Sequence, residues 1–345
     1  MRPTLRQIAE ETGLSVAAVS QILNHRPINF CSEKTKKMVL TAAERMGYRQ
    51  QFADKVRRGE STSTVALIRR SSVTSEQLQL TMMLLEKFER IGFSTYVISL
   101  QPGGSNILER IRELLQRGVD RFVLMGSPCT PELTRQAERI IAEAGRCCIG
   151  YQTDCIRSIM QDFAPAVKAT LDFFEDRIGD NFRMLLSPSP GNNRQDALCA
   201  YFPELSQQEV LKRYWFPLKL PTVQDFDQLV RHGYERTGAL MKKFPRTRGF
   251  YYLSDQLALG GVRWFVDHHL EPGKDVLLAG FNDYPGTRYC GYPVSTAAHD
   301  LEKLSDLLVE HSGGSEPCCI SVPPIIRLRE KNIDLQQQPI SIKQK

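Results

Sequence analysis

Gln21 and the residues around it have the types and spacing of a surface that reads DNA bases. Gln21 is the one side chain among them that can read a base edge by two hydrogen bonds, and adenine is its natural partner. Val16 and Ala17 offer apolar contact, for instance to a thymine methyl group. The neighbouring side chains that can reach phosphates are Thr4, Ser15, Ser20 and Asn24.

The charge of the same segment favours this interpretation. Residues 1–60 hold eleven Lys and Arg against six Asp and Glu, whereas the remaining 285 residues hold 34 against 33. Most of the formal net charge of +6 therefore lies in one small segment, as expected of a segment that neutralises phosphates. A solvated helical face is the alternative interpretation of the charge taken alone.

Three short helices are predicted to position these side chains. Thr4 begins the first helix with the spacing of a capping box, and Gly13 ends it. Ser15 caps a second helix over residues 16–23, and a third helix covers residues 32–47. Two short helices joined by a glycine-containing turn predict a helix-turn-helix, whose second helix enters the major groove. A generic three-helix bundle is the alternative.

The rest of the chain alternates short apolar runs with helical stretches from Thr64 onward. Such alternation predicts right-handed βαβ units and parallel sheets. Two series of units, dividing near residues 160–165, predict an α/β core of two doubly wound subdomains, with further crossovers near residues 290–325. Ligands of doubly wound folds bind at the carboxyl ends of the strands, so we expect a small ligand in the cleft between the subdomains.

Other chemistries find no support in the sequence. The nine cysteines include no C-x-x-C spacing, which favours reduced thiols over a disulfide framework or a structural zinc. His268 and His269 fall on different faces of a helix and do not form a metal pair. Neither a nucleophile elbow nor a phosphate-binding loop is present, so we expect no enzyme activity, no metal and no cofactor.

The apolar runs bear on the compartment in which the protein works. No run is long enough to span a membrane, and the first twenty residues lack the apolar region of a secretory signal. We therefore expect a cytoplasmic protein with no membrane partner.

Short motifs along the chain resemble those of the lactose-repressor (LacI/GalR) family of bacterial transcription regulators. They occupy residues 4–9, 13–15, 19–20, 23–24, 32–35 and 47–48 in the helical segment, and residues 252–260, 279–283 and 293–296 in the core. The motifs follow one another in the family's order. The resemblance implies a homodimeric regulator whose core, like a periplasmic binding protein, closes its two subdomains on a small molecule, most often a sugar or nucleobase.

The resemblance also implies candidate effector residues. Arg194 matches the arginine of the family's Arg-x-x-Gly-Phe motif, and Asp255 matches its pocket aspartate. An arginine opposite a carboxylate can hold adjacent sugar hydroxyls, or the arginine can bind a carboxylate or phosphate instead. Tyr151 stands where many sugar-binding relatives have Asp, which shifts the prediction away from a simple free hexose. Trp215 can stack on a sugar ring, with core packing as the alternative.

The segment between the helices and the core departs from the family pattern. Relatives usually carry Pro-Asn-x-x-Ala-x-x-Leu there and insert the leucine into the minor groove, whereas residues 50–59 read QQFADKVRRG. Val56 is the candidate wedge, and Arg57 fits an alternative register in which it reads groove width. A plain flexible linker is the third interpretation. Residues 69–74 also lack the family's Asp-x-x-Asn-Pro-Phe-Phe pattern.

These observations predict four regions, which are a helix-turn-helix domain over residues 1–49, a hinge over 50–62, an effector-binding and dimerisation core over 63–333 and a polar tail over 334–345. The predicted function is a repressor-type regulator that binds double-stranded operator DNA as a homodimer and responds to a sugar or sugar derivative. A carbohydrate sensor that acts through protein partners, with weak or vestigial DNA binding, is the alternative.

Overall fold

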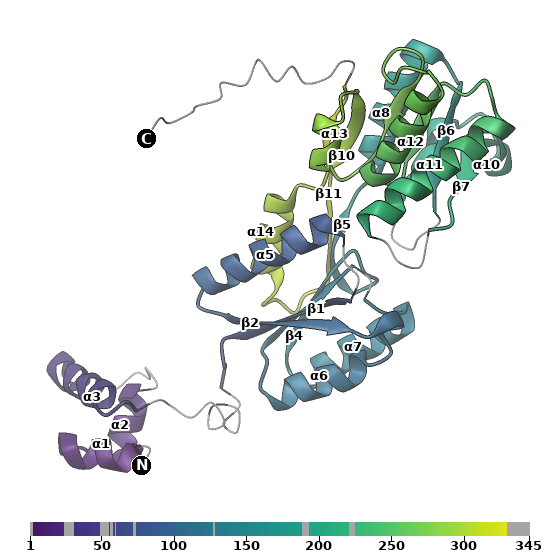
Figure 1. The fold of residues 1–345 in the computed structure, drawn as a ribbon. Helices are drawn as coiled ribbons and strands as arrows, with labels where there is room; N and C mark the ends of the chain where they lie inside the picture. The colour runs from purple at the N-terminus through teal and green to yellow at the C-terminus, as the bar shows by residue number, and fades with distance from the viewer. Residues whose placement is uncertain are drawn as a thin grey trace, which may run out of the picture. The chain divides into compact units, whose positions relative to one another are not determined.

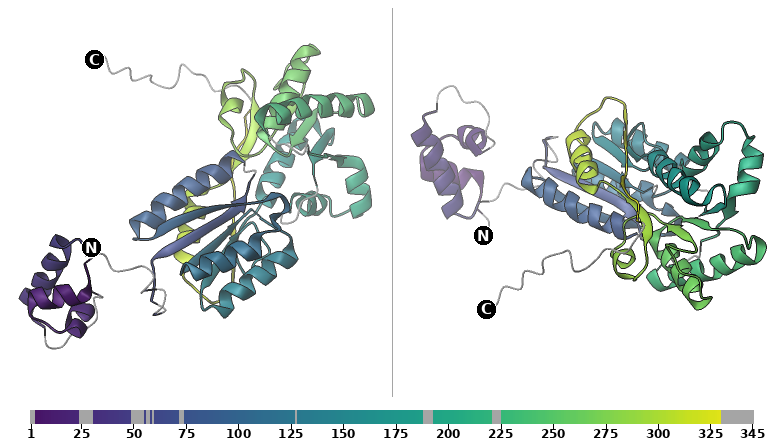
Figure 2. Two further views of the ribbon diagram at one scale, coloured as in Figure 1. Left: turned by 60° about the horizontal axis from the view of Figure 1, so that its bottom comes forward. Right: turned by 90° about the horizontal axis from the view of Figure 1, so that it is seen from above.

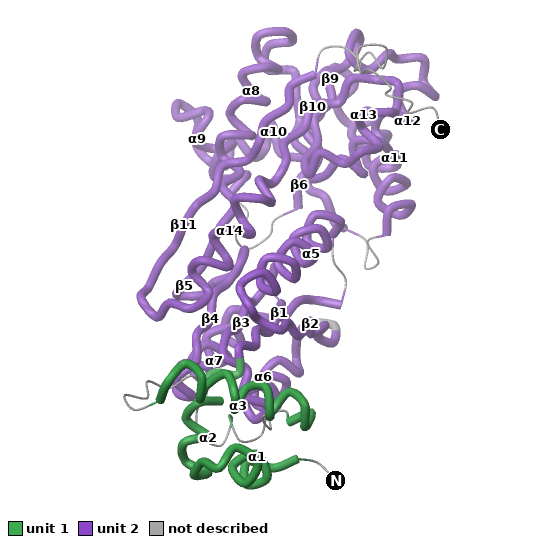
Figure 3. Tube along the Cα trace, turned by 90° about the vertical axis from the view of Figure 1, so that its left-hand side faces the viewer, with its two compact units in different colours: residues 1–62 green, residues 63–345 purple. Residues whose placement is uncertain are grey.

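The computed structural model describes residues 3–23, 31–48, 55, 58, 60–71, 74–126, 128–187, 193–220 and 225–329. The chain forms two compact units, Met1–Thr62 and Ser63–Lys345 (Figure 3). The predicted hinge residues Val56 and Arg57, and the predicted tail, lie outside the described residues.

The first unit is a head of three helices, α1 (Leu5–Thr12), α2 (Val16–Leu23) and α3 (Glu33–Arg45). The side chains of Ile8, Val19 and Val39 meet in its buried centre. Thr4 and Gln7 form the predicted capping box at the start of α1. Gly13 ends the same helix with φ at +67°, a left-handed conformation that costs other residues more than glycine. The predicted all-helical head is confirmed.

The first subdomain of the core contains a parallel six-stranded sheet with the order β11-β5-β4-β3-β1-β2. Its strands are β1 (Thr64–Arg70), β2 (Ser94–Leu100), β3 (Arg121–Met125), β4 (Cys147–Tyr151), β5 (Arg157–Gln161) and β11 (Cys318–Val322). Helices α5 (Ser75–Arg90) and α14 (Leu301–His311) cover one face. The 3₁₀ turn η1 (Pro102–Gly104) precedes α6 (Ile107–Gln116), which covers the other face with α7 (Pro131–Glu143) (Figure 2).

The second subdomain repeats this layering around a sheet with the order β12-β10-β9-β8-β6-β7. Its strands are β6 (Phe182–Leu186), β7 (Trp215–Pro217), β8 (Gly249–Tyr252), β9 (Leu277–Ala279), β10 (Val294–Ala298) and the antiparallel edge strand β12 (Ile325–Arg327). Helices α8 (Ala164–Ile178), α9 (Arg194–Tyr201) and α10 (Gln207–Tyr214) pack on one face. Helices α11 (Phe226–Lys243) and α12 (Asp255–Asp267) pack on the other, and α13 (Pro285–Tyr289) follows β9 (Figure 1).

The chain crosses between the two sheets three times, from β5 to α8, from β10 to α14 and from β11 to β12. The predicted doubly wound α/β core is confirmed. The apolar stretch over residues 318–327 forms two strands, β11 and β12, one in each sheet, because Pro323 and Pro324 separate them.

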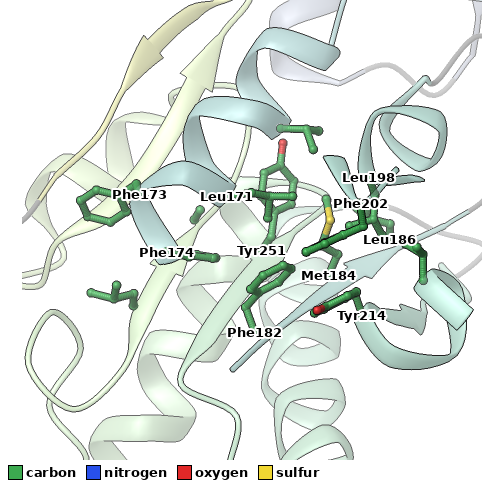
Figure 4. Close-up of a cluster of buried hydrophobic side chains, with 14 residues drawn as sticks. Leu171, Phe173, Phe174, Phe182, Met184, Leu186, Leu198, Phe202, Tyr214 and Tyr251 are labelled. Carbon is green, nitrogen blue, oxygen red and sulfur yellow. The ribbon is translucent and has the colours of Figure 1, made fainter. Parts of the chain in front are cut away.

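Aromatic side chains fill the centre of the second subdomain. The ring of Tyr214 stacks on Phe182 and Phe202, with centroid separations of 4.7 and 4.3 Å (Figure 4). Trp215 on the edge strand β7 is half-buried and packs against this cluster. Its position in the structure therefore matches the core-packing interpretation, and no contact of the described residues brings it to Arg194.

Candidate DNA-binding head and ligand cleft

Helix α2 presents an open face at its N-terminal end. Ser15 caps it by accepting a hydrogen bond from the Ala18 amide at 3.1 Å. Val16 is 45% exposed, and Ala17 and Gln21 are exposed beside it, while Val19 and Ile22 on the opposite face are buried. Val16, Ala17 and Gln21 therefore form one exposed face at the start of the capped helix.

Some of the other residues predicted to contact DNA lie in the described part of the head, and the rest lie outside the described residues. Thr4 is exposed at the start of α1, where its side chain also belongs to the capping box, and Ser20 is half-buried. Asn24, like Val56 and Arg57, lies outside the described residues.

Arg194 is the buried cation of the core cleft. It begins α9, is 4% exposed, and its guanidinium carbon lies 4.3 Å from the centroid of the Phe163 ring and 4.4 Å from that of Phe281. Burial lowers the pKa of Arg194, and the nearby Tyr251 and Glu76 oppose this shift. The centroids of the two rings are themselves 5.1 Å apart, so both rings lie towards the same side of the guanidinium rather than on its opposite faces.

Glu76 supplies a carboxylate from the first subdomain. It follows β1 as the second residue of α5, and the Thr74 hydroxyl donates to its Oε1 atom. Its Oε2 atom is buried and has no hydrogen-bond partner among the residues that the structure describes. Burial raises the pKa of Glu76, and the charge of Arg194 counteracts this. The two opposite charges thus come from different subdomains and act on each other.

His299 lies on the connection from β10 to α14 and joins the two subdomains. Its Nδ1 atom is 3.1 Å from the Tyr151 hydroxyl and 3.0 Å from Oε1 of Gln161. The Gln161 amide nitrogen donates to the Val322 carbonyl at 2.6 Å, so Oε1 faces the imidazole and Nδ1 carries the proton. Burial and Arg194 lower the pKa of His299 to about 3, and the ring is neutral at pH 7.

Asp255 is engaged within the second subdomain. It is 0% exposed, and Thr296 donates to its carboxylate with the hydroxyl 2.8 and 3.0 Å from the two oxygens. The Tyr284 amide donates to Oδ2 at 2.6 Å. Burial raises the pKa of Asp255 to about 8, against the effect of both donors. The carboxylate that acts on Arg194 is therefore that of Glu76, while Asp255 reaches the same region through its effect on Tyr251.

The structure thus brings together two of the predicted effector residues, Arg194 and Tyr151, through Glu76 and His299. The sequence analysis missed those two connecting residues. Glu76 could have been found because it begins the helix after the first core strand, at the edge of the sheet where ligands bind. His299 stands three residues after the motif that ends at Thr296, on a crossover between sheets.

Two further features of the described part of the chain bear on its function. No group of three or more His, Cys, Asp or Glu side chains there is placed to hold a metal ion. None of its helices has the length and apolar character needed to cross a membrane.

The sequence of this chain is similar to those of known transcription regulators. No protein-family model matches the chain. It is 23% identical over 334 residues to the HTH-type transcriptional regulator TreR of Salmonella typhimurium, covering 93% of this chain and 98% of that protein. It is also 23% identical over 315 residues to the regulator GalR of Lacticaseibacillus casei, covering 89% and 91%.

Solved structures give the same picture for the fold. The lac repressor dimer bound to operator and the anti-inducer ONPF matches with a TM-score of 0.74 at 16% identity, over 96% of this chain and all of that one. The regulator CelR in complex with cellobiose matches with a TM-score of 0.59 at 17% identity, over 96% and 100%. The chain therefore has the lac repressor fold, and the predicted resemblance to the LacI/GalR family is confirmed along head and core together.

Proposed function

We propose that this protein is a repressor-type transcription regulator that binds operator DNA as a homodimer and changes its DNA affinity when a small carbohydrate binds in the core cleft. It acts in the cytoplasm and is not an enzyme. The observation that carries the proposal is the open face of Val16, Ala17 and Gln21 on a helix-turn-helix head, joined to a core with the lac repressor fold.

The control of DNA binding follows from linkage. An effector shifts operator affinity only by its differential affinity for two conformations of the core. Glu76 and Arg194 belong to different subdomains and attract each other, so a ligand that inserts between them favours one separation of the subdomains over another. The head responds because the core sets the geometry of the two heads in the dimer.

Helix α5 supports the homodimer. Its inward side chains Leu80 and Leu84 are buried, whereas Leu78 and Met82, one turn apart on the opposite side, are 50% and 59% exposed. Apolar pairs at this spacing form a continuous stripe, and an exposed apolar stripe marks an interaction surface. A two-fold dimer uses the same stripe from both subunits.

Met82→Glu is expected to weaken the dimer at least tenfold, because it places a charge in an apolar contact that contributes about 1.5–3 kcal/mol when a side chain of this size is buried. Sedimentation of the full-length protein across a concentration series measures the change. Ile156→Glu is the matched control, since Ile156 is 68% exposed on a different part of the core. Equal dissociation constants for the two variants would place the dimer contact elsewhere.

Gln21→Ala is expected to remove the preference for one base pair in each half-site, a discrimination of about 1–3 kcal/mol, while non-specific DNA affinity stays the same. Systematic selection of binding sites with wild type and variant measures this preference. Gln116→Ala, at an exposed position on α6, is the control. An unchanged selected sequence would remove the base-reading role of Gln21.

The whole proposal is tested by selecting genomic fragments with the full-length protein, and again with residues 1–62 deleted. We expect a two-fold-symmetric site that is enriched by the full chain and lost on deletion. If no fragment is enriched at low and moderate salt, with or without candidate sugars, the alternative of a sensor acting through protein partners replaces this proposal.

A further inference from the structure

A second excess of positive charge lies in the core, at the end of α11 and the start of β8. Residues 231–248 hold six Lys and Arg against the single acidic residue Glu235. This excess of five equals that of residues 1–60, where eleven Lys and Arg stand against six Asp and Glu. Four of the six cations are exposed near the end of the segment and form what we call the basic surface, Lys242, Lys243, Arg246 and Arg248.

Two further arginines extend this charge towards the edge strand β7. The guanidinium carbon of Arg183 lies 4.6 Å from the centroid of the Phe244 ring, and Nζ of Lys243 lies 5.2 Å from the same centroid. Arg236 lies over the Phe216 ring at 4.7 Å, and the two ring centroids are 6.5 Å apart. Like charges therefore gather around one aromatic pair, where they repel one another.

The chain itself does not neutralise the basic surface. None of its four side chains forms an ion pair with a carboxylate of the described residues. A helix C-terminus stabilises cations in its last turn, which accounts for Lys242 and Lys243 in α11. It does not account for Arg246 and Arg248, which lie beyond the end of the helix. The surplus charge is thus available to an anionic partner.

The surroundings of the basic surface favour a nucleic acid backbone over a protein as that partner. Stable protein interfaces have an apolar centre in which charged residues are depleted. No large apolar side chain between Phe226 and Tyr289 is exposed, and all residues of this stretch are described. Binding to the DNA backbone needs no apolar centre, because it is driven by the neutralisation of phosphates and the release of counterions.

The basic surface is also separate from the effector cleft and from the head. Arg248 directly precedes β8 and Arg183 is the second residue of β6, so both stand at the amino ends of parallel strands. The cleft lies at the carboxyl ends, where Arg194 follows β6. The head is a different compact unit of the chain.

We propose that the basic surface binds the phosphate backbone of a second DNA segment, independently of its sequence, while the heads hold the operator. Contacts to phosphates position a protein on DNA and read no base. The inference goes beyond the proposed function, since neither the base-reading face of α2 nor the effector takes part in it. A protein with both contacts holds two DNA segments close together and raises the effective concentration of one near the other.

The salt dependence of DNA affinity tests this contact. Fluorescence anisotropy measures the affinity of the full-length protein for a duplex of random sequence between about 50 and 200 mM salt. The variant combines Lys242→Gln, Lys243→Gln and Arg246→Gln. Each lost phosphate contact reduces the slope of log affinity against log salt by about 0.9, so we expect a slope shallower by about two to three units. The heads are the same in both proteins.

The matched control combines Arg110→Gln, Arg135→Gln and Arg139→Gln. These exposed arginines lie on the first subdomain, and each pairs with a glutamate of its own helix. The control loses the same net charge away from the basic surface and is expected to keep the wild-type slope. A further variant with Lys242→Arg, Lys243→Arg and Arg246→Lys retains the charge and is also expected to keep that slope, which separates the effect of charge from any effect on folding.

Equal slopes in the wild type and in the first variant would overturn the inference and would indicate an acidic protein as the partner instead. An equal change in the matched control would also overturn it, because the effect would then come from net charge alone. DNA-site selection is independent of both results. A protein that selects an operator but shows no slope change keeps the proposed function and loses this inference, whereas a slope change without a selected site does the reverse.

Discussion

Replacing Arg194 by alanine is expected to weaken effector binding to the full-length protein by about 2–4 kcal/mol, roughly 30- to 1000-fold. The substitution removes the charged donors of the cleft and leaves the buried Glu76 carboxylate without its nearby cation. Calorimetry with a sugar that binds the wild type measures the loss. Arg194→Lys keeps the charge but not the planar fork, so it is expected to recover only part of the affinity.

The matched control for Arg194→Ala is Arg177→Ala. Arg177 on α8 also places its guanidinium carbon over an aromatic ring, 4.1 Å from the centroid of Phe173. It belongs to the same subdomain and loses the same kind of cation–π contact, but it stands near the other end of α8 from Phe163. Unchanged effector affinity in Arg194→Ala, or an equal loss in both variants, would remove Arg194 from the effector site.

The regular alternation of short apolar runs and helical stretches made most of the fold predictable from the sequence. Strands such as β3 (Arg121–Met125) are largely apolar runs followed by clear helices, which is the pattern of a buried parallel strand. Strand β5 (Arg157–Gln161) was missed, because it begins and ends with a polar residue and is separated from β4 by only a short turn. Its Arg157 is buried by bonding to carbonyls of residues 311, 314 and 316, which are distant in the sequence.

The cleft was less predictable than the fold, because its residues meet only through tertiary structure. Arg194 could be identified from its resemblance to a family motif, and its pairing with a carboxylate was anticipated. Which carboxylate acts on it depends on the packing of two subdomains, and Glu76 precedes Arg194 by more than a hundred residues. The same holds for His299, whose partners Tyr151 and Gln161 lie on another sheet.

Asp255 is expected to make the folding stability fall as pH rises towards 8. Burial raises its folded-state pKa to about 8 from its ordinary value of 3.8, so the folded protein holds this proton more tightly than the unfolded chain does. The stabilising contribution is complete below pH 3.8 and is lost as pH rises through about 8. A difference of about four pKa units corresponds to roughly 5 kcal/mol over the whole range.

His299 makes the folding stability depend on pH in the opposite direction at lower pH. The effect of Asp255 is therefore best measured above the pH range in which His299 titrates. Its pKa falls from 6.5 to about 3 on folding, so it contributes stability above pH 6.5 that is lost as pH falls towards 3. The two effects oppose each other below pH 6.5. Above pH 6.5 the histidine is neutral in the folded protein and mostly neutral in the unfolded chain, so the contribution of Asp255 dominates up to pH 8.

Asp255→Asn is therefore expected to flatten the stability profile between pH 6.5 and 8. Urea unfolding of the wild type in this window should lose about 2 kcal/mol, since one proton changes the free energy of unfolding by about 1.4 kcal/mol per pH unit. The asparagine variant has no proton to lose and should show no such slope. Asp283→Asn is the contrasting control, because Arg288 and Arg329 hold the pKa of Asp283 below its usual value despite burial, and that group is ionised throughout the window. The same slope in the wild type and in Asp255→Asn would mean that Asp255 is ionised at neutral pH, with its charge balanced by the Thr296 and Tyr284 donors and the nearby Arg329.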